Sequence, residues 1–250
     1  ALPGAQGNVL AMAFEKKRFY LGGAMPSVGR VVAEGVAKFD GKHWRALPDG
    51  PPQNVVALEM FKERLYVGGF FANAGDQPAG GLASWNGHKW SVHGGTDGVI
   101  YALRANGQEG LLVGGRFTLP GWTNPVALAR YDGKERWKVL NSELSPCGNA
   151  DSVCLDAIQQ LEFLPSRDIV AVLSFSVREW WGGWGGPINF LLARCDRNDH
   201  WSNFPGPDGD PSSFAYLNYT LAQFGGCLVA GGNFTNASNP AIRNVAIWDG

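Results

Sequence analysis

The segment 54–92 reads NVVALEMFKERLYVGGFFANAGDQPAGGLASWNGHKWSV, and its order of features decides the fold. Residues 8–47 repeat that order, and a third copy starts at Val99. The Gly-Gly pairs of the three copies begin 46 residues apart, at Gly22, Gly68 and Gly114. A dipeptide of Asp or Asn before Gly recurs at the same interval. A repeat of this length determines the architecture, so it is interpreted before any single motif.

Each copy contains four runs that are typical of strands, and in the first copy they cover 9–14, 19–23, 35–39 and 44–47. The turns between the third and fourth runs predict type I′ hairpins, because both central residues of that turn need a positive φ. These turns are Asp40-Gly41, Asn86-Gly87 and Asp132-Gly133. Two further dipeptides should have the same role between first and second runs, namely Asn106-Gly107 and Gly225-Gly226.

The Gly-Gly pairs and the recurrent tryptophans predict close packing between repeats. A residue without Cβ lets a neighbouring backbone or ring approach closely. A tryptophan in the fourth run of a copy would bury a large area against the next copy. These tryptophans are Trp44, Trp90, Trp137 and Trp201.

Short four-stranded units that recur every 40 to 50 residues or so cover one another's faces when they are stacked radially. The sequence therefore predicts an all-β chain, a β-propeller of four-stranded antiparallel blades in a single domain over 1–250. The expected blades are 8–53, 54–97, 98–154, 155–213, and 214–250 together with 1–7. The fifth copy stops before its fourth run. Two architectures are open, a five-bladed ring closed by the N-terminal residues or part of a six- or seven-bladed ring, and the second is slightly favoured because 1–7 has no tryptophan.

The bulk composition argues against some partners. A net charge of −1 and a pI near 6.5 provide no overall basic field for nucleic acid or an anionic membrane. The longest apolar stretch, 169–177, is shorter than the about 20 residues that span a bilayer. We expect no nucleic-acid partner and no direct membrane insertion. The chain has no leader at Ala1, which predicts a processed form or a fragment.

Cysteines and glycosylation sequons favour a secreted or cell-surface glycoprotein. Cys147 and Cys154 are seven residues apart in a loop and could form a disulfide. Cys195 and Cys227 are ambiguous, since a buried thiol also packs as a small hydrophobe. Asn-x-Ser/Thr sequons occur at Asn218, Asn233 and Asn236, of which Asn236 is the strongest candidate for a glycan.

The long loops between second and third strands should gather at one end of the propeller, with tight hairpins at the other. Four tryptophans fall in these loops: Trp122, Trp180, Trp181 and Trp184. They would form a platform for sugar rings or a contact surface for a protein. The alternative, slightly favoured, is that the insertion in the fourth copy folds back as a core plug. The turn Asp208-Gly209-Asp210 is only a weak calcium signal.

No motif of an enzyme or cofactor site is present. We expect no metal, because no closely spaced Cys or His pair occurs. His43, His88 and His200 lie in or beside turns, and His93 ends an outer strand, so all four are interpreted as turn or surface residues. Hydrolase and nucleotide-binding motifs are missing. A carboxylate pair of a glycosidase leaves no sequence spacing and stays open.

The order apolar run, Gly-Gly, variable loop, aromatic-Asp and Trp resembles the Kelch repeat of Kelch and galactose-oxidase-type propellers. The forms LYVGGFF…LASWNGHKW and LVAGGNFTNASNPAIRNVAIWDG are more similar still to repeats of fungal cortical polarity markers and related bacterial and algal surface proteins. The resemblance covers nearly the whole chain. It implies the propeller fold but says little about function, because propellers host many activities.

We therefore expect a non-catalytic extracellular interaction or assembly module without cofactor, which presents its loop-rich end to a protein or polysaccharide. One alternative is a carbohydrate-binding or glycoside-processing propeller. Another is a structural subunit of a surface filament or coat.

Overall fold

The computed structural model describes residues 4–52, 54–93, 96–140, 153–177, 189–204, 219–235 and 243–248. The chain divides into two compact units, Ala1–Lys138 and Val139–Gly250. The described residues contain strands, turns and bends but no helix. Accordingly, no helix suited to crossing a bilayer occurs in this part of the chain.

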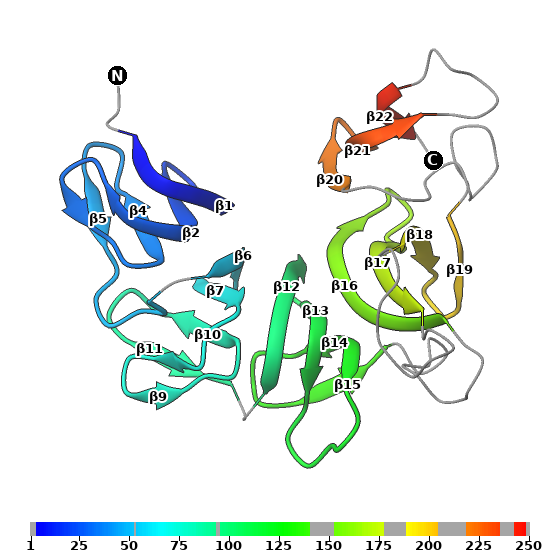
Figure 1. The fold of residues 1–250 in the computed structure, drawn as a ribbon, viewed down its shortest axis with the longest axis horizontal. Coiled ribbons are helices and arrows are strands. Elements are labelled where there is room, and N and C mark those ends of the chain that lie inside the picture. The colour runs from blue at the N-terminus through cyan, green and yellow to red at the C-terminus, as the bar shows by residue number, and fades with distance from the viewer. Residues whose placement is uncertain are drawn as a thin grey trace. The chain divides into compact units, whose positions relative to one another are not determined.

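The first unit contains three antiparallel sheets (Figure 1). The first sheet has the order β1-β2-β4-β5, with β3 added to β2. Its strands are β1 (Ala5–Glu15), β2 (Arg18–Val28), β3 (Val31–Val32), β4 (Val36–Phe39) and β5 (Trp44–Ala46). The second sheet has the order β11-β10-β7-β6, and a short pair β8-β9 accompanies it. Its strands are β6 (Val55–Phe61), β7 (Arg64–Gly69), β8 (Asn73–Ala74), β9 (Gln77–Pro78), β10 (Leu82–Trp85) and β11 (Trp90–Val92). The third sheet, β12-β13-β14-β15, consists of β12 (Asp97–Asn106), β13 (Gly110–Thr118), β14 (Val126–Tyr131) and β15 (Trp137–Val139).

The second unit contains two more antiparallel sheets. The fourth sheet consists of β16 (Val153–Phe163), β17 (Ile169–Val177), β18 (Asn189–Cys195) and β19 (Trp201–Asn203). The fifth consists of β20 (Tyr219–Phe224), β21 (Cys227–Thr235) and β22 (Arg243–Trp248). The prediction of an all-β propeller with five blades is confirmed.

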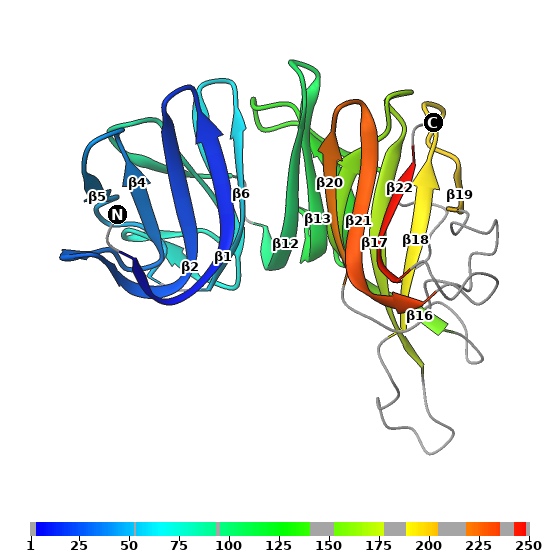
Figure 2. The same ribbon diagram turned by 90° about the horizontal axis from the view of Figure 1, so that it is seen from above.

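The first strand of each blade in the first unit lies beside that of the next, in the order β1, β6 and β12 (Figure 2). Each of these strands is bent by a register shift just before an alanine, and β16 of the fourth sheet has the same shift. The alanines are Ala11, Ala57, Ala102 and Ala157. A bulge at a fixed place increases the local twist, which lets short sheets stack face to face.

The Gly-Gly pairs occupy crowded positions, as predicted. A Cβ on Gly22 would lie 2.6 Å from Cγ1 of Val55, and one on Gly68 would lie 2.7 Å from Cγ2 of Ile100. The first glycine of these two pairs therefore contacts a side chain from the first strand of the next sheet. The second glycine lies against the partner strand, where a Cβ on Gly69 would be 2.1 Å from the carbonyl oxygen of Asn54. The neighbour is thus an aliphatic side chain or backbone rather than a tryptophan ring.

Tryptophans connect neighbouring blades through their indole N–H groups. Trp90 Nε1 donates to the carbonyl oxygen of Pro48, 2.8 Å away, and Trp201 Nε1 donates to that of Leu140, 2.9 Å away. Both acceptors lie in the segment that enters the blade from the preceding one. The predicted packing role is confirmed for these two residues.

The Asp-Gly turns differ from the predicted type I′ form. In the loop 40–43, Gly41 has a φ of 99°, whereas Asp40 does not have a positive φ. The Asp40 carboxylate instead accepts the backbone N–H groups of Lys42 and His43, at 2.9 and 2.8 Å. These side-chain bonds stabilise a four-residue loop, because Phe39 pairs with Trp44.

The same correction applies to the other turns of this kind. Asn86 and Asp132 cap their loops through their side chains in the same way, and Asn106 does not have a positive φ either. Only Gly225-Gly226 has the predicted form. It has φ values of 60° and 84° between the paired residues Phe224 and Cys227.

Candidate functional site

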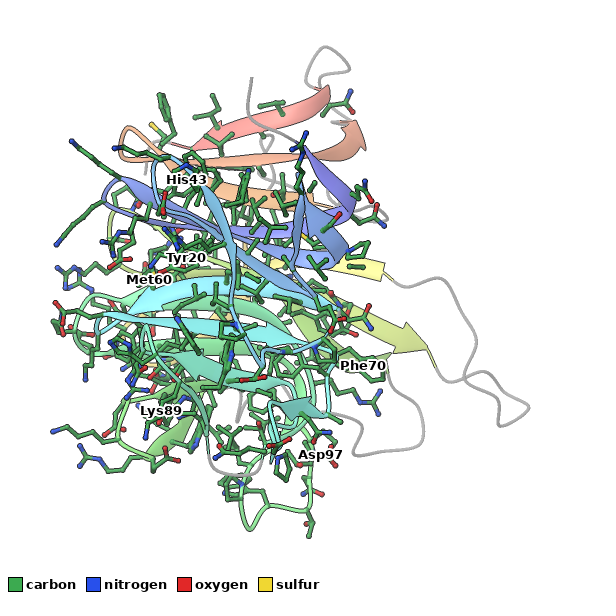
Figure 3. All side chains as sticks on the ribbon, turned by 90° about the vertical axis from the view of Figure 1, so that its left-hand side faces the viewer. Tyr20, His43, Met60, Phe70, Lys89 and Asp97 are labelled. Atoms are coloured by element: carbon green, nitrogen blue, oxygen red, sulfur yellow. The ribbon has the colours of Figure 1, made fainter. Side chains whose placement is uncertain are left out.

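The first unit has a turn end and a loop end, as the sequence predicts. His43 and Lys89 lie at the end that carries the tight hairpins, and Phe70 and Asp97 lie at the opposite end (Figure 3). A group of charged side chains lies at the turn end of the first sheet, not at the loop end.

An open depression of about 560 Å³ lies at this turn end. Its cationic or titratable lining residues are Lys17, Arg18, Lys38, Lys42, His43 and Arg45, and Asp40 is the one carboxylate among its lining residues. We call this feature the cationic depression. At neutral pH its five Lys and Arg side chains outnumber the carboxylate, so the depression has a strongly positive field.

Strand register gathers these side chains. Tyr20 pairs with Lys38 across β2 and β4, and Lys38 pairs with Arg45 across β4 and β5, so the three side chains form a row on one face. Arg18 precedes Tyr20 by two residues and therefore lies on the same side of β2. The Lys38 ammonium lies 5.4 Å from the centroid of the Tyr20 ring, within cation–π range.

Asp40 supports the turn more than it neutralises the depression. The backbone N–H of His43, the Arg45 side chain and the backbone N–H of Lys42 hold the pKa of Asp40 well below its usual range. Its Oδ2 lies 2.9 Å from Nε of Arg45. The carboxylate therefore stays ionised and offsets one cation, which leaves the positive charge of the lysines in excess.

The second blade shows that the fold does not require this charge in every repeat. At the positions of Lys17, Lys38 and Arg45, the second blade has Glu63, Ser84 and Ser91. The turn is capped in the same way in both blades, through Asp40 in one and Asn86 in the other. The full set of cations is therefore not required by the repeat, although the third blade also has basic residues, Arg130 and Lys138, at the positions of Lys38 and Arg45.

The net charge of the whole chain gives no indication of this basic surface. Residues 1–138 contain 16 Lys and Arg against 11 Asp and Glu, a net charge of +5, whereas residues 139–250 contain 5 against 11, a net charge of −6. The two parts nearly cancel to the total of −1. The sequence reasoning used that total and so missed the depression. Comparing charges repeat by repeat would have found it.

A second polar feature connects the second and third sheets and resembles a hydrolytic triad. Ser84 Oγ lies 2.8 Å from Nε2 of His93, and Nδ1 of His93 lies 2.9 Å from the Tyr131 hydroxyl. That hydroxyl donates to Glu135 Oε1 at 3.0 Å, and Arg64 Nη1 donates to Ser84 Oγ at 3.3 Å. The chain is consistent when His93 carries its proton on Nδ1: the Ser84 hydroxyl then donates to Nε2, Nδ1–H donates to the Tyr131 hydroxyl oxygen, and that hydroxyl donates to Glu135.

This hydrogen-bonded chain is not accessible to a substrate. Ser84 is 0% exposed and His93 is 5% exposed. Burial lowers the pKa of His93 and raises that of Tyr131, so both side chains are neutral at pH 7. A nucleophile must reach its substrate, so the Ser84–His93 pair is structural rather than catalytic.

His93 is therefore not the surface residue that the sequence reasoning expected. The same position of the first blade is occupied by Leu47, a buried core residue, and this correspondence could have revealed the burial. The other three histidines are exposed as predicted: His43, His88 and His200.

The predicted loop-end site is described only in part. Trp122 is 54% exposed, and its backbone N–H donates to the carbonyl oxygen of Leu119. Other predicted site residues lie outside the described residues, namely Trp180, Trp181, Trp184, Cys147, Asn218 and Asn236, as do Asp208 and Asp210. For Cys154 and Asn233 the backbone alone is described, in β16 and β21. The disulfide, the glycans and the tryptophan platform stay predictions.

Two other cysteines are described. The Cys195 thiol is buried and donates to the carbonyl oxygen of Asp196, whereas Cys227 is a free thiol. Across the described ranges, no three His, Cys, Asp or Glu side chains gather as a metal site would require.

An apolar row on β1 is exposed. It consists of Leu10, Met12 and Phe14, which are 52%, 56% and 67% exposed. In the second blade the equivalent of Met12 is Leu58, which is 6% exposed and packs against Gly22 of the preceding blade. The row therefore lies on the strand face that, in the second blade, is covered by the first blade.

In the second unit, the fifth sheet has the complementary face, the one whose glycine contacts the next sheet in the first and second blades. Gly231 occupies the position of Gly22, yet a Cβ there would have the Thr220 methyl group at 3.4 Å as its nearest neighbour, and no other side chain of the described residues would lie within 4 Å. Val245 is paired with Gly231 and is exposed, as are Ile247 and Phe224.

Comparison with known proteins supports the fold alone. No family model matches the chain, and no curated protein matches it. The extracellular domain of BT4673 from B. thetaiotaomicron, named as a hybrid two component system, is similar with a TM-score of 0.55 and 12% identity over 96% of this chain and 26% of that one. A second structure of that extracellular domain, named as a one component system, has a TM-score of 0.53 and 12% identity over 96% and 27%.

The chain therefore spans about a quarter of the length of these structures. An exo-1,5-alpha-L-arabinanase from a bovine ruminal metagenomic library is more distant, with a TM-score of 0.44 and 14% identity over 99% and 94%. At these identities the similarity defines the chain as a β-propeller and does not identify its activity. The Kelch-type resemblance is matched by no family model and stays a prediction.

Proposed function

We propose that this chain is a non-catalytic extracellular β-propeller that acts as an interaction and assembly module. The two similar structures with the highest TM-scores above are named as extracellular domains, which supports a location outside the cell. The sequons and the proposed disulfide favour the same compartment. The triad-like chain supports a non-catalytic role, because its serine is inaccessible.

The observation that carries the proposal is the exposed row Leu10, Met12 and Phe14 on β1. Scattered apolar residues are normal on a surface, but a contiguous row on one strand face marks an interaction site. In this repeat the same face is otherwise covered by another blade. Its natural occupant is therefore a blade-like sheet face with a glycine at its centre.

The fifth sheet offers such a face, with Gly231 surrounded by Val245 and Ile247. We therefore propose that the fifth sheet of a second copy of the chain covers the β1 row; closure of a ring by the chain's own fifth sheet would instead leave a monomer, and the test below distinguishes the two. Two different surfaces would meet, which is a heterologous contact, and such contacts build rings or open filaments. This geometry supports the assembly role, and a surface filament or coat is one assembly that such contacts can build.

Sedimentation velocity over a range of concentrations tests the proposal. The wild-type chain should self-associate, and Met12→Asp and Ile247→Asp should each abolish the association. Val32→Asp is the matched control, because Val32 is an exposed apolar strand residue outside both faces. A mixture of Met12→Asp and Ile247→Asp chains should form a dimer and nothing larger, since each variant retains one intact face. A wild-type chain that stays monomeric at every concentration would overturn the proposal.

A second candidate function is carbohydrate binding at the loop end, which the exposed Trp122 favours. An exposed indole in a loop stacks well on a sugar ring. A glycan array with wild type, Trp122→Ala and Trp181→Ala distinguishes the two roles. Sugar binding that both substitutions abolish would favour a lectin, and absence of binding to every glycan would favour assembly.

A further inference from the structure

We propose that the cationic depression of the first blade binds an acidic polysaccharide, a chain that carries sulfate or uronate groups. The site is independent of the assembly faces, because its lining residues lie at the turn end of β2, β4 and β5 rather than in the row on β1. The second blade of the same chain serves as a comparison, since it has the same turns without the cluster of cations.

Electrostatics favour an extended anion over a single small one. The cations come from two turns and three strands around an open depression of about 560 Å³. Lys17, Lys38 and Lys42 are flexible point charges that suit a repeated series of anionic groups, whereas a single phosphate is usually held by a closed set of converging donors. The contacts form at an exposed surface, so binding should weaken steeply with salt.

The chemistry of the depression favours a polysaccharide over single-stranded nucleic acid. Proteins that bind single strands combine positive charge with aromatic platforms on which bases stack. No Trp, Tyr or Phe is among the lining residues of the depression, and the neighbouring Tyr20 ring is buried. Tyr20 is further covered by Lys38, whose ammonium lies over its ring. The site thus offers charge and hydrogen-bond donors, and the His43 imidazole is the one ring among its lining residues.

Binding of immobilised dextran sulfate and polygalacturonate to the full chain tests the proposal, with neutral dextran as the reference. The double variant Lys17→Glu/Lys42→Glu should weaken binding on the order of tenfold or more, because it reverses two charges at the rim. The matched control is Lys89→Glu/Lys134→Glu, which reverses two exposed lysines in the turns of the second and third blades that correspond to the turn of Lys42. Thermal unfolding of each variant confirms that the sheets are intact.

A gain-of-binding variant makes the test independent of damage to the fold. Asp40→Asn removes the carboxylate from the lining but retains an oxygen that caps the turn, as Asn86 does at 2.9 Å from the N–H groups of His88 and Lys89. Affinity for dextran sulfate should rise severalfold at low salt, and the difference should shrink as salt is added.

Three results would overturn the inference. The first is the absence of binding to either anionic polymer at low salt. The second is an equal loss in both double variants, which would indicate a diffuse charge effect of the whole unit. The third is that an oligothymidylate of similar charge binds more tightly than the polysaccharides, which would assign the surface to nucleic acid.

Discussion

Oγ of Ser84 lies 2.8 Å from Nε2 of His93, and both residues are buried. The contact joins β10 to the residue that follows β11. Through Tyr131 it also joins the second sheet to the third. The corresponding residues of the first blade are Lys38 and Leu47, so this polar pair belongs to the second blade and not to the repeat.

His93 should make the folded chain sensitive to acid. Burial lowers its pKa below the ordinary 6.5, so between the folded pKa and 6.5 the unfolded state binds more protons. The contribution of His93 to the free energy of unfolding is therefore fully present above pH 6.5. As the pH drops below 6.5 this contribution is lost, by at most about 1.4 kcal/mol per pH unit. Urea unfolding at a series of pH values measures this slope.

His93→Leu should flatten that pH dependence, since Leu47 shows that the repeat accepts leucine here. The groups that face His93 keep partners in the variant, because Arg64 still reaches Ser84 and Tyr131 still reaches Glu135. His88→Leu is the control, because His88 is exposed and should leave the slope unchanged. An unaltered slope in His93→Leu would contradict the assignment.

Gly68→Ala should destabilise the chain by about 1–3 kcal/mol, because the new Cβ would lie 2.7 Å from Cγ2 of Ile100. Gly231→Ala is the matched control at the equivalent repeat position, where the nearest atom is 3.4 Å away, and it should be close to neutral. Thermal unfolding compares the two. Ile100→Ala added to Gly68→Ala should recover part of the loss, and failure to do so would point to a cause other than this contact.

Glu63→Gly should stabilise the hairpin between β6 and β7 by about 0.5–1 kcal/mol. Lys62 and Glu63 have φ values of 48° and 60°, a region that is costly for residues with a Cβ. Lys62 is left in place because its ammonium donates to the carbonyl oxygen of Asp132 at 2.8 Å. Lys17→Gly changes the equivalent residue of the first blade, which does not have a positive φ, and it should instead destabilise. Chemical denaturation of both variants checks the sign.

Asp168→Asn should destabilise the fourth sheet by about 1–3 kcal/mol. The Asp168 side chain is 6% exposed, accepts Nε of Arg194 at 2.8 Å and also accepts the Ser166 hydroxyl at 3.0 Å. Asp132→Asn alters a similar pair with Arg136 on the surface and should have a smaller effect. Equal effects of the two substitutions in denaturant melts would show that burial of the Asp168 pair adds nothing.

Periodicity in the sequence was sufficient to predict the blades. The interval between Gly22 and Gly68 located the strands, and the crowding that it implied is present at Val55 and Ile100. Local turn chemistry was less predictable. Asp40-Gly41 has the composition of a type I′ turn, but the carboxylate stabilises a longer loop by accepting two backbone N–H groups. A dipeptide does not specify which of these hydrogen-bonding patterns will form.

The sequence by itself determined the class of fold, because a repeat imposes the same strand order and the same crowded glycines on every blade. The tertiary structure alone decided which surfaces carry chemistry. His93 is buried against the rings of Tyr66 and the third-sheet Tyr131, and strand register places Lys38 and Arg45 on the face that also carries Arg18. Burial and charge density depend on neighbours that are distant in the chain, and the local sequence does not encode those neighbours.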